Sequence, residues 1–261
     1  MTEPVLYQAS EGVATITLNR PEVLNAVNAG LLASLLAAIQ RASDDAEVRA
    51  VVLTGAGRGF CAGSDLVARH KAGLDSVDLG KSARDNLNPV ITAMRSLSKP
   101  LLTAVNGPAA GAGMSIALAG DLVVASRSAK FALAFTKIGL VPDGGNTYFL
   151  PRYVGELRAR ALTILGETVD AEEACRIGMV WKVYDGEAFA EETGKLARHL
   201  ANMPTRAIGI CKQALNASSG NELAAQLELE ASLQTCASQT DDFREGVAAF
   251  VQKRAPQFKG C

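Results

Sequence analysis

The N-terminal part of the chain combines short alternating runs with helical periodicity. Residues 4–9 and 12–19 are typical of a β-hairpin, because VATITLN alternates in polarity and follows a Glu-Gly turn. Residues 28–43 predict a helix, because leucines recur along one face and Asn28 can serve as the N-cap. The chain is therefore expected to begin with a hairpin followed by a helix.

Three later apolar runs predict buried strands, because they are short, rich in Val, Leu and Ala, and bounded by glycine or polar residues. They are RAVVLTG at 49–55, LLTAVNG at 101–107 and DLVVAS at 121–126. A helix over 84–98, with Pro89 near its first turn, is predicted between the first two. The short apolar helix GAGMSIALAG at 111–120 separates the last two, and residues 66–80 are polar and irregular.

From about residue 152 onward the pattern is helical, apart from the strand-like MVWKVYD at 179–185. The final helices are predicted at 188–202, 204–217, 221–236 and 240–253. Strands and helices that alternate first, and helices alone afterwards, predict an α/β core with a helical tail. Residues 101–125 are long enough to span a membrane, but glycine, proline and Asp121 interrupt them, which favours strand, loop, helix and strand.

Composition narrows the class of protein. The chain has 261 residues, of which 48% are hydrophobic and 20% charged, which suits a globular protein with a sizeable core. Its net charge of −1 would attract neither nucleic acid nor an anionic membrane, so neither is an expected partner. The cysteines have no CxxC spacing and MTEPVLYQAS has no secretory pattern, so we expect reduced thiols and a cytoplasmic location.

The sequence gives little support for dinucleotide binding or for metal binding. The GAGRG stretch at 55–59 is followed by Phe60 where a dinucleotide-binding fingerprint requires glycine, although Asp75 has the spacing of a ribose-binding acid. The only histidines, His70 and His199, lack carboxylate or thiol companions at metal-ligand spacing, so no metal site is expected. Acid–base chemistry would therefore fall to a carboxylate.

A candidate carboxylate is Asp143, in the stretch GLVPDGG at 139–145, although Pro-Asp-Gly is also a good turn sequence. Two glycine-rich loops, FCAGSDL at 60–66 and NGPAAGAGMS at 106–115, each follow a predicted buried strand. The second loop runs into a helix, which leaves N–H groups near Ala112 free to bind an oxygen. The two loops could form an oxyanion hole, or their glycines could serve close packing alone.

Several stretches, in this order, resemble the crotonase (enoyl-CoA hydratase/isomerase) superfamily along essentially the whole chain. They are LNRPEVLNAV at 18–27, AVVLTGAGRGFCAGSDL at 50–66, KPLLTAVNGPAAGAGMSIALAGDLVVAS at 99–126, KIGLVPDGG at 137–145 and EGVAAFVQKRAPQF at 245–258. The resemblance implies an α/β fold, with a crotonase-like spiral core of repeated ββα turns over 1–200 and a helical trimerisation region over 201–261. It also implies an acyl-CoA thioester substrate, no metal, no cofactor besides the CoA of the substrate, and a homotrimer or dimer of trimers.

The same resemblance assigns roles to individual positions. It implies that the backbone N–H groups of Ser64 and Ala112 bind the thioester oxygen, each donor contributing roughly 3–4 kcal/mol to transition-state stabilisation. The implied CoA contacts are Val23, Leu24, Ala62, Asp65, Leu66, Gly111 and, in the tail, Lys259. Family hydratases carry two glutamates, and the corresponding positions here are Ser115 and Phe135. Neither side chain can serve as a general acid or base for hydration.

The remaining carboxylate, Asp143, stands where family isomerases carry a single acid. The run PDGG–LPR–VG over 142–155 resembles 1,2-epoxyphenylacetyl-CoA isomerases and their relatives. We therefore expect an acyl-CoA isomerase in which Asp143 moves a proton to shift a double bond, or rearranges an aryl epoxide, beside the thioester. Apolar surroundings such as Phe135, Ile138 and Leu140 should raise the pKa of Asp143.

Three alternatives stay open at this point. An enoyl-CoA hydratase would add water to a 2-enoyl-CoA in spite of the missing glutamates. A hydrolase or dehalogenase would use Asp143 as a nucleophile and pass through an ester. A non-catalytic acyl-CoA-binding protein would keep the CoA loops without needing Asp143.

Overall fold

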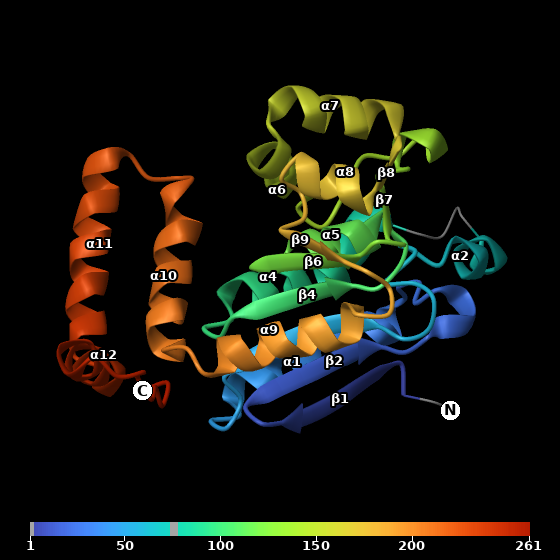
Figure 1. Cartoon of the computed structure of the whole chain (residues 1–261). Helices are drawn as coiled ribbons and strands as arrows, with labels where there is room; N and C mark the ends of the chain where they lie inside the picture. Colours follow the sequence, from blue (N-terminus) through green and yellow to red (C-terminus); the bar gives the residue numbers. More distant parts are fainter. Residues whose placement is uncertain (1–2, 74–77) are drawn as a thin grey trace.

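The computed structural model describes residues 3–73 and 78–261, so Asp75 lies outside the described residues. Its main sheet has six strands in the order β1-β2-β3-β4-β6-β9 (Figure 1). The strands are β1 (Val5–Ser10), β2 (Val13–Leu18), β3 (Ala50–Gly55), β4 (Leu101–Val105), β6 (Leu122–Ser126) and β9 (Lys182–Tyr184). The predicted hairpin is confirmed as the antiparallel pair β1–β2, and all other neighbours in this sheet run parallel.

A second, three-stranded sheet has the order β5-β7-β8, with β5 (Ala109–Ala110), β7 (Lys130–Ala132) and β8 (Thr168–Asp170). The sequence pattern did not predict these strands, because two or three residues are too few to show an alternation. The second sheet matters for the site, because β5 lies in the glycine-rich loop that precedes Ala112.

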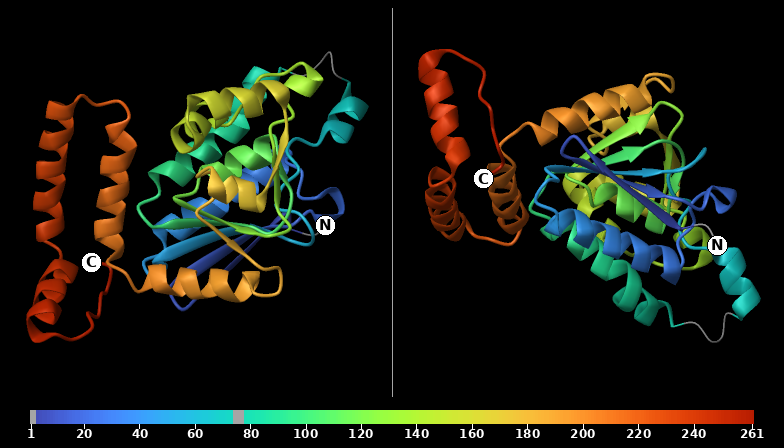
Figure 2. Two further views of the ribbon diagram at one scale, coloured as in Figure 1. Left: turned by 45° about the horizontal axis from the view of Figure 1, so that its top comes forward. Right: turned by 90° about the horizontal axis from the view of Figure 1, so that it is seen from below.

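Helices cover both faces of the main sheet (Figures 1 and 2). On one face lie α1 (Ala29–Asp44), α4 (Asn88–Ser96) and α5 (Ala112–Leu118), and on the other lies α9 (Phe189–Ala201). Along β3, Val51 and Leu53 face the first group while Ala50 and Val52 face α9. This double burial explains why β3 is a continuous apolar run instead of an alternating one.

The predicted helix over 84–98 begins earlier than its sequence indicates. The helical segment starts at α3 (Leu79–Ser82), continues through a π-helical turn, η3 (Ala83–Leu87), and ends with α4. Pro89 therefore lies inside a longer helical segment. Because proline has no N–H to donate, the regular hydrogen-bond ladder cannot pass through it, and the wider turn lies directly before it.

The remaining helices lie around the first loop, beside the second sheet and in the C-terminal region. They are α2 (Leu66–Ala72), α6 (Asn146–Val154), α7 (Glu156–Leu165), α8 (Ala171–Arg176), α10 (Thr205–Ser218), α11 (Leu223–Ser238) and α12 (Asp241–Gln252), with 3-10 turns η1 (Pro21–Val23) and η4 (Thr136–Ile138). The four predicted C-terminal helices are thus present, and Figure 1 shows α10–α12 beside the sheet-containing core. None of the helices within the described residues is both long enough and apolar enough to cross a membrane.

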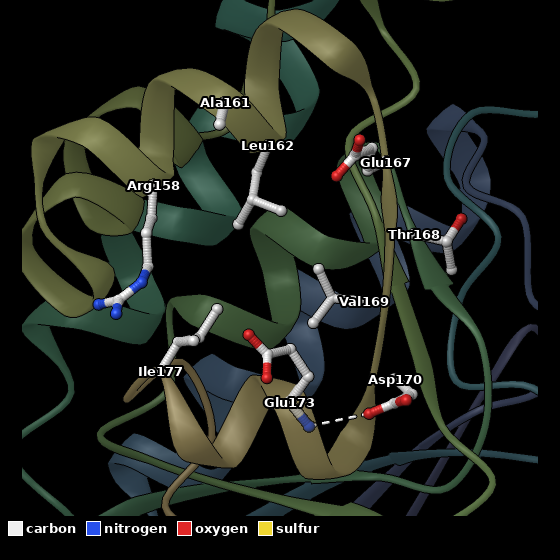
Figure 3. A pocket seen from close by; sticks show the side chains of 9 residues that line it. All are labelled: Arg158, Ala161, Leu162, Glu167, Thr168, Val169, Asp170, Glu173 and Ile177. Carbon is white, nitrogen blue, oxygen red and sulfur yellow. Dashed lines mark hydrogen bonds between the residues drawn. The ribbon is translucent and has the colours of Figure 1, made fainter.

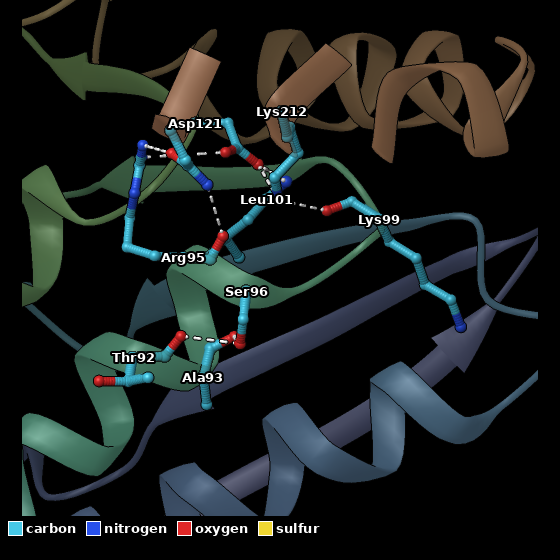
Figure 4. Close-up of polar contacts among 9 residues, drawn as sticks. Thr92, Ala93, Arg95, Ser96, Lys99, Leu101, Asp121 and Lys212 are labelled. Carbon is cyan, nitrogen blue, oxygen red and sulfur yellow. Dashed lines mark hydrogen bonds and ion pairs between the residues drawn. The ribbon is translucent and has the colours of Figure 1, made fainter. Parts of the chain in front are cut away.

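Polar contacts join α10 to the core (Figure 4). The Lys212 ammonium lies 2.7 Å from a carboxylate oxygen of Asp121 and donates to the carbonyl of Lys99 at 2.8 Å. The Asp121 carboxylate also accepts the Leu101 N–H at 2.8 Å, and Arg95 lies 4.0 Å from it. Burial lowers the pKa of Lys212, and the Asp121 carboxylate opposes this change.

Candidate active site

The two glycine-rich loops lie against each other because they follow neighbouring parallel strands. They leave the carboxyl ends of β3 and β4, which meet at one edge of the sheet. The Ala110 N–H donates to the Cys61 carbonyl at 2.9 Å, which links the first loop to β5. Gly63 has a φ of +88°, and a Cβ at this position would lie 2.7 Å from the Ala110 carbonyl oxygen. Only glycine lets the loops approach this closely.

Both predicted oxyanion donors are present as unpaired amides. Among the residues that the structure describes, no acceptor is bonded to the N–H of Ser64 or to that of Ala112. Ala112 is the first residue of α5, so its N–H has no partner within the helix and the positive end of the helix dipole adds to it. A Cβ built on Gly63 would lie 3.5 Å from the Ala112 nitrogen, so the first loop borders this amide directly.

Asp143 lies in a turn that is packed against α5. Gly144 and Gly145 follow it with φ values of +56° and +82°, which confirms the turn predicted from Pro-Asp-Gly-Gly. The Ser115 hydroxyl donates to the Asp143 carbonyl at 2.9 Å. Ser115 is one helical turn after Ala112, so α5 connects the free amide to the Asp143 turn.

The Asp143 carboxylate is largely shielded from water, and a nearby positive charge offsets only part of the cost of burying its negative charge. Its Oδ1 atom is buried and has no hydrogen-bond partner in the described part of the chain. Burial raises the pKa of Asp143 above its ordinary value, and the positive charge of Arg69 on α2 opposes this shift. The raised pKa that the sequence predicted is therefore confirmed, with Arg69 as a neighbour that no sequence pattern indicated.

The expected apolar surroundings are confirmed only in part. Phe135 is buried, and its ring lies 3.6 Å from the position that a Cβ on Gly111 would take, so it borders the second loop. Ile138, by contrast, is 52% exposed, because it ends the short turn η4 and its side chain is not packed in the core. Burial also raises the pKa of the Cys61 thiol to about 12, so this cysteine of the first loop stays protonated.

Most of the predicted CoA contacts gather around the first loop. The Ala62 N–H donates to the Leu24 carbonyl at 2.9 Å, and Val23 ends the adjoining turn η1. Asp65 caps α2 through the Ala68 N–H at 3.0 Å and pairs with Arg20 at 3.1 Å, so its side chain already has partners. Leu66, at the start of α2, is 49% exposed.

Lys259 does not join this group within one chain. Its N–H donates to the Asp242 carboxylate at 2.6 Å, which holds the tail against α12. The C terminus and α2 lie at opposite ends of the molecule in every view of Figures 1 and 2. A contact of Lys259 with the same chain's site is therefore excluded by the path of the tail.

A separate cavity of about 290 Å³ lies between α7, β8 and α8 (Figure 3). Its charged side chains are Arg158, Glu167, Asp170 and Glu173. Glu173 pairs with Arg176, and Asp170 caps α8 through the Glu173 N–H, so these acids have local structural roles. None of the residues predicted for the site lines this cavity.

Comparisons with known proteins assign both the sequence and the fold to one family. The sequence matches the Enoyl-CoA hydratase/isomerase family over residues 8–261, and the chain belongs to this family. It is 48% identical to the 1,2-epoxyphenylacetyl-CoA isomerase of Escherichia coli over 100% of both chains. It is 47% identical to a Rhodobacter capsulatus protein named "Probable enoyl-CoA hydratase" over 98% of each.

Solved structures support the same assignment. An enoyl-CoA hydratase from Bacillus anthracis superimposes with a TM-score of 0.93 at 31% sequence identity, covering 99% of this chain and 100% of the other. The crotonase-like α/β fold predicted from the sequence is therefore confirmed. The protein is an enzyme of the hydratase/isomerase family, and the isomerase and hydratase names among its relatives leave the reaction itself to be argued from the site.

Proposed function

We propose that the protein is an acyl-CoA isomerase that shifts a double bond beside the thioester, with Asp143 as its single proton carrier. The observation that carries the proposal is the buried Oδ1 of Asp143, which no group of residues 3–73 and 78–261 bonds. It lies in a turn that is hydrogen-bonded to α5, the helix that begins with the Ala112 amide. A desolvated carboxylate with a raised pKa is a stronger base than one in water.

In this mechanism the thioester oxygen accepts hydrogen bonds from the Ser64 and Ala112 amides. The Asp143 carboxylate removes a proton from C2 of a 3-enoyl-CoA, or in the reverse direction from C4 of a 2-enoyl-CoA, and the electron pair of the broken C–H bond delocalises into a dienolate. The two amides stabilise the negative oxygen. The protonated Asp143 then returns its proton to the other carbon, so the double bond has moved and the enzyme is regenerated.

Hydration has less support in this site. It requires groups that hold and activate water as well as a proton donor. The Ser115 hydroxyl is engaged with the Asp143 carbonyl, and Phe135 offers no polar atom. One carboxylate is sufficient to transfer a proton between two carbons, which favours isomerisation.

The similarity to the Escherichia coli 1,2-epoxyphenylacetyl-CoA isomerase suggests a substrate class. We propose that an aryl-substituted acyl-CoA, including an aryl epoxide beside the thioester, can occupy the site. Rearrangement of such an epoxide would need the same two elements, an oxyanion hole and one carboxylate that manages protons. The CoA portion would lie along Val23, Leu24, Ala62, Leu66 and Gly111, and Asp65 would contribute through its backbone.

We also propose that residues 201–261 mediate assembly into a homotrimer or dimer of trimers. Leu223, Phe250 and Val251 are large apolar side chains left exposed on α11 and α12, which supports an interface there. In such an assembly Lys259 could reach the CoA of a neighbouring subunit. The core over 1–200 would then carry the whole reacting site.

Asp143→Asn tests the mechanism with 3-hexenoyl-CoA as substrate. The amide cannot accept the proton, so we expect formation of the 2-enoyl product and uptake of solvent deuterium to fall by at least about 100-fold. Asp185→Asn changes an exposed aspartate and serves as the control. Isomerisation at the wild-type rate in Asp143→Asn contradicts the proposal.

The same preparations separate the alternatives. Formation of 3-hydroxyacyl-CoA from 2-hexenoyl-CoA at a useful rate would indicate a hydratase. An acyl or aryl ester on Asp143, detected by mass spectrometry, would indicate a nucleophilic mechanism. Tight CoA binding without turnover of any thioester would indicate a binding protein.

A further inference from the structure

We propose that Ser115 and Asn146 are positioning residues that fix the Asp143 carboxylate relative to the oxyanion amides. The inference rests on the isomerase function proposed above. It is carried by a hydrogen-bond chain that runs from the Asn146 side chain through the Ser115 hydroxyl to the main chain of Asp143. Neither Ser115 nor Asn146 is assigned a proton-transfer role.

The direction of the chain follows from the number of protons available. The Asn146 Nδ2 donates to the Ser115 Oγ at 2.6 Å, and the Ser115 Oγ donates to the Asp143 carbonyl at 2.9 Å. A second acceptor for the serine proton, the Gly111 carbonyl, is farther away at 3.4 Å. A hydroxyl has one proton, so when Ser115 donates to Asp143 it must accept from Asn146.

Ser115 and Asn146 are both buried, so the loss of either hydrogen bond would disturb the structure around Asp143. Ser115 is 0% and Asn146 is 1% exposed, so water cannot replace a lost partner without entering the core. The Asn146 Oδ1 has no hydrogen-bond partner among the described residues. Burying an amide with an unpaired oxygen costs stability. This cost is explained if the amide nitrogen of Asn146 is needed to position Ser115.

Packing adds a steric restraint to the hydrogen bonds. A Cβ on Gly144 would lie 2.7 Å from the Cβ of Ser115, so the turn after Asp143 lies directly on α5. Every residue of α5 is buried, which makes this helix a rigid support. Ala112 and Ser115 are three residues apart on one face of it, so a single helix sets the positions of an oxyanion donor and of the base.

The test uses Ser115→Ala, Asn146→Ala and the double variant with 3-hexenoyl-CoA. We expect each single variant to lower kcat by about 10- to 100-fold with little change in KM, because the reacting geometry is disturbed while CoA binding remains. The double variant should lose no more than the larger single loss, because both residues act through one chain. Ser126→Ala, a buried serine outside the site, is the matched control.

A pH profile separates positioning from loss of stability. When the turn loosens, water reaches Asp143 and its raised pKa falls toward the ordinary value, so the acid limb of kcat/KM moves to lower pH. A lower Tm alone would not move this limb. If Ser115→Ala fails to fold, the same shift is expected in Asn146→Ala, where α5 keeps its serine.

The outcomes distinguish this inference from the function on which it rests. Wild-type kcat and an unchanged acid limb in the folded single variants overturn the positioning role, as do losses that multiply in the double variant. If Asp143→Asn abolishes isomerisation while Ser115→Ala and Asn146→Ala do not affect it, only the positioning role is wrong. If Asp143→Asn keeps full activity, the proposed function fails first.

Discussion

At the scale of the residue, the burial that would make Asp143 a stronger base in the proposed reaction also makes this residue costly to stability. Its Oδ1 is buried without a partner in the part of the chain that the structure describes, and burial raises the pKa of this carboxyl. The folded protein therefore binds this proton more tightly than the unfolded chain does. Stability associated with Asp143 is fully present below its ordinary pKa of 3.8 and is lost as the pH rises through the raised pKa.

Asp143→Asn should consequently raise Tm at pH 7, because the amide carries no charge to desolvate. The gain should shrink as the pH falls through the raised pKa of Asp143 and vanish below 3.8. Thermal unfolding of both proteins across a series of pH values measures this difference. An equal or lower Tm of the variant at every pH, with Asp185→Asn as the control, would show that burial of the charge is not costly.

At the scale of the element, the proposed oxyanion site depends on how closely the two glycine-rich loops approach each other. The loops follow adjacent parallel strands, and Gly63 is the point at which a side chain would meet the Ala110 carbonyl. The Ser64 amide comes directly after this glycine, and the Ala112 amide comes two residues after Ala110. The geometry of both donors therefore depends on a position without a Cβ.

Gly63→Ala should push the loops apart and reduce kcat by about 100-fold or more, the typical effect of losing one oxyanion donor. Gly166→Ala is a matched control, because Gly166 also has a positive φ, +61°, but its nearest neighbour is the flexible Lys137 side chain. Steady-state kinetics of the two variants, with Tm as a check on folding, compare the effects. Equal kcat values for both would mean that backbone strain alone, not loop separation, is responsible.

At the scale of the whole molecule, a largely buried ionic contact joins the helical C-terminal region to the sheet-containing core. Lys212 of α10 reaches across to Asp121, which directly precedes β6, and both side chains are mostly shielded, at 8% and 18% exposure. The same ammonium bonds the Lys99 carbonyl, which precedes β4. α10 is thus fixed to the ends of two neighbouring strands (Figure 4).

Lys212→Met should lower the free energy of unfolding by about 3 kcal/mol, because the Asp121 carboxylate stays shielded from water and loses its 2.7 Å ion pair. Among the described residues it would keep the more distant Arg95 and the Leu101 N–H. Lys81→Met removes an exposed ion pair with Asp85 and should change stability by less than about 1 kcal/mol. Denaturant unfolding of both variants measures the contrast. A loss in Lys212→Met no greater than that in Lys81→Met would contradict a role of this contact in holding α10.

The long elements could be predicted because their signals are local. The alternation in β2, the leucine stripe and Asn28 cap of α1, and the apolar runs of β3, β4 and β6 all lie within single segments. The π-helical turn before Pro89 and the short strands β5, β7 and β8 were missed. Their geometry depends on partners distant in the sequence, which no local pattern contains.

For the site, the sequence alone determined which chemical groups are present. It supplied one candidate acid at Asp143, glycines at the two loops, and no acid at 115 or 135. Only the tertiary structure decided how these groups meet. The desolvation of Asp143 and its proximity to Arg69 depend on segments that are far apart in the sequence. The same holds for the hydrogen bonds from Asn146 to Ser115 and from Ser115 to Asp143. Burial and hydrogen-bond geometry are properties of packed neighbours, and they exist only once the chain has folded.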